Sequence, residues 1–198
     1  MVQKTIAKMD RRKFVGSTTI GALAFHVAGG TSLLTPKQAH AEKVGLRHFD
    51  AQQISLLSAF CEHLLPGATD GGVVEFIDHQ LGETPNECLL MCKYFPGINA
   101  PYVDFYTGGL ASLETYTQHS YAKNFANLTM DEKDQTVQAL WAGKADPWQG
   151  PPPPLFYMML RSDAVDVVYG TEGGFEELGI PYMAHIRPPA DWSNSGVK

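Results

Sequence analysis

Apolar residues recur at three- to four-residue spacing in several segments of this chain, and most of these segments end at glycine or proline. The clearest begins at Asp50, a predicted N-cap that Gln53 can complete as a capping box, and ends at 66–67. Two more helices are predicted over 73–81 and over 129–143, the second capped by its first residue, a threonine. Further helices are predicted over 86–94, over 101–116 with a proline in the first turn, and over 155–169. No segment of useful length alternates between apolar and polar residues, so the predicted fold class is all-α.

A single helical domain is expected to make up most of the chain. The 198 residues, 44% of them hydrophobic and 18% charged, have the balance of a globular domain that can bury a core. We assign this domain to residues 42–198. Within it, the four prolines at 151–154 predict a stiff extended linker. Residues 170–198, rich in glycine, proline and aromatic residues, predict an irregular C-terminal tail.

Residues 1–41 have the three parts of an export signal. A basic front is followed by an apolar run over 15–34, and then by Ala39 and Ala41, the small residues of an A-x-A cleavage site. We therefore predict a signal peptide that is cleaved after Ala41. The alternative is an uncleaved transmembrane anchor, because about 18 apolar residues can span a bilayer. Glycine and polar residues interrupt this run, which favours cleavage.

The basic front carries the pattern of a twin-arginine signal. Arg11 and Arg12 are adjacent, and Lys13 and Phe14 follow them directly. Signals of this kind export proteins that have already folded, often after a cofactor or partner has bound. The pattern therefore predicts a periplasmic protein that crosses the membrane in its folded state.

The charge distribution argues against a nucleic-acid partner. The net charge of the whole chain is -6. Six of the 15 basic residues, but only one of the 21 acidic residues, lie within residues 1–41, so the remainder carries a net charge of about −11. Such a surface repels phosphate backbones and offers no basic patch to anionic lipids.

Motifs that hold common redox cofactors are missing from the sequence. The glycine pairs at 71–72 and 173–174 lack the spacing of a phosphate-binding loop. The chain has no Cys-x-x-Cys-His run for covalent haem and no Gly-x-Ser-x-Gly elbow for a hydrolase. We therefore predict no cofactor and no catalytic residue in this chain.

The three cysteines are Cys61, Cys88 and Cys92. In an oxidising compartment a structural disulfide is expected, from Cys61 to either of the other two, which leaves one thiol over. The last two are four residues apart and share a face if they lie on one helix, so they are poorly placed to bond to each other. A metal site is the alternative, with the three thiols and His63 or His79 as ligands.

The C-terminal region is the predicted docking surface. It is rich in the aromatic and long side chains that dominate protein interfaces, and it also contains two acids three residues apart on one helix. These side chains could instead pack back onto their own domain, and the two acids could serve as helix-capping or ion-pair groups. The residues predicted to dock a partner are Asp163, Asp166, Tyr169, Phe175, Tyr182, Met183, His185 and Trp192.

Two stretches in this region resemble a known family. They are residues 161–171, RSDAVDVVYGT, and residues 173–186, GGFEELGIPYMAHI, followed by the prolines at 188–189 and by Trp192. Both resemble the signature of the gluconate 2-dehydrogenase subunit 3 family. Weaker similarity extends over 64–68 and 72–78, in the same order along the chain.

The resemblance implies the small subunit of a periplasmic, membrane-associated sugar or sugar-acid dehydrogenase. Its partners would be an FAD-containing subunit of the glucose-methanol-choline type and a cytochrome subunit that carries haem c. The small subunit would be non-catalytic, and its signal would export and stabilise the flavoprotein. A stand-alone periplasmic enzyme that depends on a metal or histidine, or a free binding protein, is the alternative.

Overall fold

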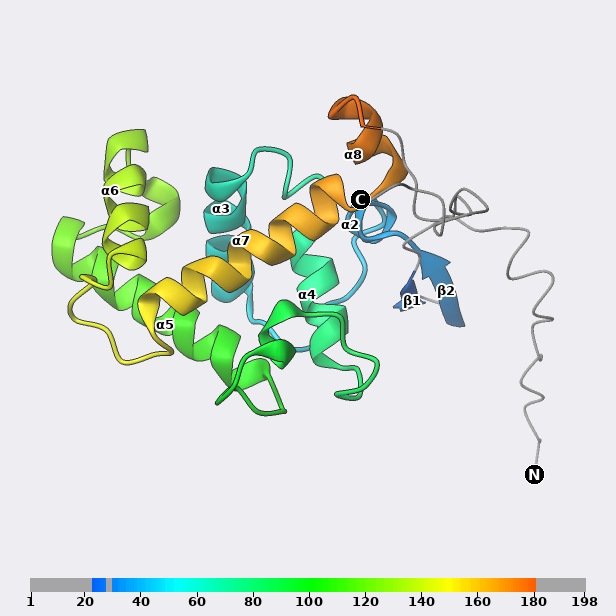
Figure 1. The fold of residues 1–198 in the computed structure, drawn as a ribbon, viewed down its shortest axis with the longest axis horizontal. Helices are drawn as coiled ribbons and strands as arrows, with labels where there is room; N and C mark the ends of the chain where they lie inside the picture. Colours follow the sequence, from blue (N-terminus) through cyan, green and yellow to red (C-terminus); the bar gives the residue numbers. More distant parts are fainter. Residues whose placement is uncertain (1–22, 28–29, 181–198) are drawn as a thin grey trace, which may run out of the picture.

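The computed structural model describes residues 23–27 and 30–180 of the chain. These residues form a mostly helical body with one small two-stranded hairpin (Figure 1). The longer helices are α3 (Ala51–Leu64), α4 (Val73–Leu81), α5 (Val103–Tyr121), α6 (Met130–Trp141) and α7 (Pro153–Tyr169). The shorter elements are β1 (Leu23–Val27), β2 (Gly30–Leu34), α2 (Pro36–Ala41), η1 (Met91–Tyr94), η2 (Phe125–Asn127) and α8 (Glu172–Glu177). The prediction of a mostly helical chain is confirmed, and no helix in the described ranges has the length and apolarity to cross a membrane.

Two capping boxes start helices where the sequence predicts them. At the start of α3 the Gln53 amide N–H donates to Asp50 Oδ1 at 2.8 Å, and the Asp50 amide N–H donates to Gln53 Oε1 at 3.0 Å. Thr129 and Glu132 make the same reciprocal pair at the start of α6. Each box satisfies amide groups that would otherwise lack a partner in the first helical turn.

Aromatic side chains around α7 form the centre of the main core. Phe156 of α7 is fully buried and lies between Phe60 of α3 and Phe105 of α5, with both ring centroids 6.2 Å from its own. Gly109 of α5 makes this packing possible, because a Cβ atom there would lie 2.2 Å from the Phe156 ring. Figure 1 shows α7 running diagonally across the other helices, so it ties them into one body.

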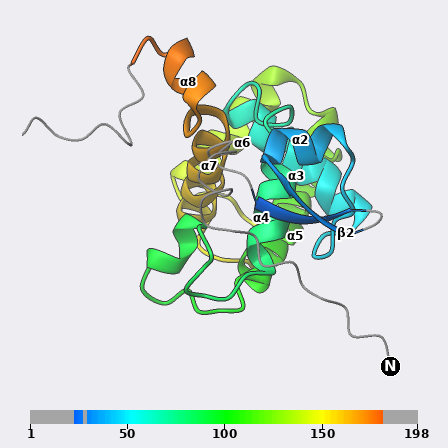
Figure 2. The ribbon, with the colours of Figure 1, turned by 90° about the vertical axis from the view of Figure 1, so that its right-hand side faces the viewer.

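The hairpin corrects the prediction that the chain contains no strands. β1 and β2 pair antiparallel, with Leu23 opposite Leu34 and Phe25 opposite Ser32. Phe25 and Leu34 are buried together with Ala39 of α2 in a small cluster of their own. Two five-residue strands inside an apolar run are too short for alternation to reveal. Seen from the side, the hairpin and α2 lie beside α4 (Figure 2).

Other boundaries also differ from prediction. Only η1 forms within 86–94, so Cys88 and Cys92 do not share a helix. The linker predicted at 151–154 is partly helical, because proline lacks an N–H and is accepted in a first turn such as that of α7. The start predicted at 101 falls later, at Val103, and the tail from 170 contains the short helix α8.

Candidate interaction site

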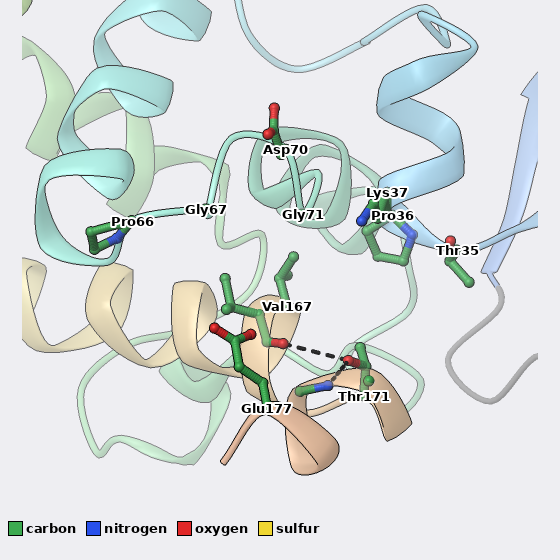
Figure 3. Close-up of a pocket in the computed structure, with 13 residues that line it drawn as sticks. Thr35, Pro36, Lys37, Pro66, Gly67, Asp70, Gly71, Val167, Thr171 and Glu177 are labelled. Carbon is green, nitrogen blue, oxygen red and sulfur yellow. Dashed lines mark hydrogen bonds between the residues drawn. The ribbon is translucent and has the colours of Figure 1, made fainter. Parts of the chain in front are cut away.

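A pocket of about 670 Å³ lies where α2, the loop after α3, the end of α7 and α8 meet (Figure 3). It brings the predicted signal segment next to the region predicted to dock a partner, although the two are far apart in sequence. The lining residues are Thr35, Pro36, Lys37, Pro66, Gly67, Asp70, Gly71, Val167, Val168, Thr171, Gly173, Gly174 and Glu177.

Hydrogen bonds hold both walls of the pocket in place. On one wall the amides of Gly67 and Thr69 donate to the Glu62 carboxylate at 2.9 Å each. Burial raises the pKa of Glu62, but these hydrogen bonds outweigh it and lower the pKa below its usual value. On the other wall the Thr171 hydroxyl accepts from the Gly174 amide at 3.1 Å and thereby caps α8. The loop and the α8 turn are therefore ordered parts of the site.

The charged groups at this pocket are exposed. Lys37, Asp70 and Glu177 lie at its edge, and Asp70 points away from Val167 and Thr171 in Figure 3. Exposed charges are well solvated, and they gain little of the altered acidity that acid–base catalysis needs. The arrangement suits surface contacts better than chemistry.

Asp163, predicted to dock a partner, lies inside the core. Its side chain is fully buried and accepts a hydrogen bond of 2.7 Å from the Tyr106 hydroxyl, while its second oxygen, Oδ1, has no partner. Burial raises the pKa of Asp163 to about 7, against the lowering effect of the Tyr106 hydrogen bond. A fully buried carboxyl cannot contact another protein, so the prediction that Asp163 docks a partner is wrong.

All three cysteines are buried free thiols, so the predicted disulfide is wrong. Cys61 and Cys92 lie close enough to Asp163 for its charge to raise their pKa, although burial is the larger cause for both thiols. The pKa of Cys92 reaches about 12, even though a hydrogen bond with Tyr106 lowers it. Thiols this far from ionisation are poor nucleophiles and poor metal ligands.

The two histidines considered as metal ligands have other partners. His63 Nε2 lies 3.0 Å from Asp134 Oδ1, and His79 Nε2 donates to the Ala24 carbonyl oxygen at 3.2 Å. Within the described part of the chain, no group of three or more histidine, cysteine, aspartate or glutamate side chains is placed to hold a metal ion.

Other predicted site residues are divided between the surface, the interior and the parts not described. Asp166 is exposed, and Tyr169 and Phe175 are half-buried at the end of α7 and in α8. Ala39 is fully buried in α2, whereas Ala41 is exposed at its end. Outside the described residues lie Arg11, Arg12, Phe14, Tyr182, Met183, His185 and Trp192.

α7 also has an outward-facing stripe of side chains, of which only Tyr169 was among the residues predicted from the sequence to dock a partner. Tyr157, Arg161, Val165 and Tyr169 recur every four residues and are exposed or half-buried. Trp141 at the end of α6 is 64% exposed and packs edge-on against Tyr157, with ring centroids 5.6 Å apart. Their four-residue spacing inside a predicted helix was the available signal. Aromatic and arginine side chains at this density are typical of protein interfaces.

A comparison with protein-family profiles identifies the family of this chain. The sequence profile described as Gluconate 2-dehydrogenase subunit 3 matches residues 51–185, which begin at the first residue of α3. The chain belongs to this family. The resemblance found in the sequence is thereby confirmed, and membership indicates a subunit of a gluconate 2-dehydrogenase-type complex. No curated protein and no solved structure matches the chain.

Proposed function

We propose that this chain is the non-catalytic small subunit of a periplasmic, membrane-associated, FAD-dependent dehydrogenase. In this proposal it binds the flavoprotein subunit in the cytoplasm and supplies the twin-arginine signal that exports the pair. FAD lies in the flavoprotein and haem c in a cytochrome subunit, and the complex is associated with the membrane through the partner subunits. The family match is the observation that carries the proposal.

The outward stripe of α7 supports a docking role. Its Tyr157, Arg161, Val165 and Tyr169 side chains offer aromatic area and a bidentate donor on a rigid helix. Lone exposed apolar residues are ordinary, whereas this stripe continues onto Trp141, and continuous exposed apolar surface is a feature of interaction sites. We assign the flavoprotein contact to this stripe together with Asp166, Phe175 and the tail.

Changing Arg11 and Arg12 together to lysine tests the export half of the proposal. Lysine keeps the charge, so general attraction to the membrane is preserved while the twin-arginine pattern is lost. We expect the flavoprotein and its dehydrogenase activity to remain in the cytoplasm. The matched control changes Lys4 and Lys8 to arginine in the same basic front and should leave export intact. Periplasmic flavoprotein in the double lysine variant would refute the escort role.

Val165→Asp tests the docking half. The side chain is 37% exposed, so the charge is tolerated in the free subunit but would be buried unpaired in a complex. We expect copurification of the flavoprotein to fall at least tenfold, with the circular dichroism of the subunit unchanged. Met130→Asp, at an exposed apolar residue off the stripe, is the control. Equal loss in both variants, or in neither, would remove α7 from the interface.

A further inference from the structure

Residues 23–27 and 30–41 pack onto one face of α4. The Phe25 and His79 rings have centroids 4.8 Å apart, and His79 Nε2 donates to the Ala24 carbonyl oxygen. At the other end of the segment, His40 Nδ1 donates to Glu75 Oε1 at 2.9 Å. Glu75 and His79 are one helical turn apart, so α4 holds both the hairpin and α2 with a single face.

Gly72 allows α2 to pack closely against the start of α4. A Cβ atom on this residue would lie 2.1 Å from the Pro36 carbonyl oxygen, so the first turn of α2 rests directly on the glycine backbone. The φ angle of Gly72 is +82°, a left-handed value that glycine adopts without strain. This close approach makes the α2 contact a specific one.

The contact also buries two polar atoms that lack a hydrogen-bond partner. Glu75 Oε2 and His79 Nδ1 are buried without hydrogen-bond partners, and such groups lose the hydration they would have in water. A pocket of about 360 Å³ adjoins the contact, lined by Leu23, Pro36 and Phe76 together with Leu89 and the end of α7. Segments with incomplete packing open more readily than the rest of a domain. Residues 23–27 and 30–41, called the cover below, are therefore the segment that we expect to open while the helical body stays folded.

The cover hides the predicted cleavage site. Ala39 is fully buried, its amide donates to the Thr35 carbonyl, and its own carbonyl accepts from the Val44 amide at 3.0 Å. A peptidase that recognises the side chains at 39 and 41 needs this backbone extended, which breaks these hydrogen bonds and exposes Ala39. The recognised conformation and the docked conformation exclude each other.

We propose that docking of the cover on α4 withholds the Ala41–Glu42 bond from signal peptidase until the cover opens. Cleavage hydrolyses that amide: water adds a hydroxyl to the Ala41 carbonyl carbon, and the Glu42 nitrogen leaves with a proton. Release then exposes Glu75, Phe76 and His79 on the surface of the exported chain. The inference rests on the export signal of the proposed function but not on the flavoprotein.

The test compares cleavage of the purified full chain by purified signal peptidase in detergent with cleavage of a synthetic peptide covering residues 35–48. Mass spectrometry follows the product that begins at Glu42. If docking protects the bond, the chain is cut roughly tenfold or more slowly than the peptide, because only the open fraction reacts. Equal rates, or no cut after Ala41 in the peptide, would overturn the proposal.

His79→Ala separates docking from recognition, because it leaves every residue read by the peptidase unchanged. Loss of its hydrogen bond and ring contact should speed cleavage of the chain roughly three- to tenfold. His63→Ala is the matched control: its side chain is equally buried, at 7% exposure, but it pairs with Asp134 away from the cover. His40→Ala gives the same test from the segment side, at the unread middle position of A-x-A, should His79→Ala fail to fold. If the His79→Ala and His40→Ala chains fold and are both cleaved no faster than wild type, the proposal that docking protects the bond is refuted.

Discussion

Replacing Asp163 by asparagine should make the protein more stable near neutral pH. Burial raises the pKa of this carboxyl from 3.8 to about 7 in the folded state. The folded chain therefore keeps the proton while the unfolded chain loses it. The contribution of this carboxyl to the free energy of unfolding is largest below pH 3.8, falls as the pH rises, and levels off above about pH 7. Asparagine is neutral throughout and avoids this loss.

The size of the effect follows from the two pKa values. Their separation corresponds to roughly 4 kcal/mol, because one pKa unit is about 1.4 kcal/mol. Urea unfolding at about pH 4 and about pH 8 measures it. From about pH 4 to about pH 8, the free energy of unfolding of the wild type should fall by a few kcal/mol more than that of Asp163→Asn. Glu62 is unchanged in both proteins and cancels in the comparison, whereas the Asp166 charge is part of what raises the Asp163 pKa.

An exposed carboxyl supplies the control. Asp70→Asn removes an equal charge from the surface and should leave the pH dependence of the wild type in place. The reasoning fails if Asp163→Asn has the same pH dependence as wild type, or if it is less stable than wild type at about pH 8. Either result would mean that Asp163 is ionised at little cost inside the core.

Three further outcomes test the packing. Gly109→Ala should cost roughly 1–3 kcal/mol of unfolding free energy in urea, because its Cβ would meet the Phe156 ring, and an unchanged midpoint would contradict that contact. Asp50→Ala should cost about 1 kcal/mol in the same assay through loss of the α3 cap, whereas Asp70→Ala should cost nothing measurable. All three cysteines should resist a thiol reagent in the native chain and react fully in denaturant. A shortfall of free thiols in denaturant would show a disulfide after all.

Local signals gave the helix starts and most of the helices. The Asp50–Gln53 and Thr129–Glu132 boxes are interactions between neighbouring residues, so their sequence patterns suffice. α4 coincides with its predicted range because Gly72 and Gly82 bound it. Interactions between residues far apart in the sequence were harder to predict. The hairpin is the main example, because residues of α4 contact it and these contacts leave no local pattern in its own sequence.

The position of Asp163 shows where the prediction of the site failed. Met159, Leu160, Asp163 and Val167 share the spacing of one helix face, and all four are buried. The periodicity places the aspartate in the core, whereas its charge suggested the surface. The cysteines were misread for a related reason. Their compartment favoured a disulfide, but the fold packs them as protonated thiols beside a buried carboxyl.

α7 has two working sides. On its inner side α7 contacts α4 and Val167 is buried, whereas Arg161 and Val165 are exposed to solvent. In the proposed function, the chain must bind the flavoprotein before its signal peptide is removed. With this geometry the flavoprotein can reach Tyr157 and Arg161 while residues 30–41 remain on α4, whereas Asp166 lines one pocket together with Leu23 and Pro36. Contact of the flavoprotein at Asp166 would therefore couple its binding to removal of the signal segment.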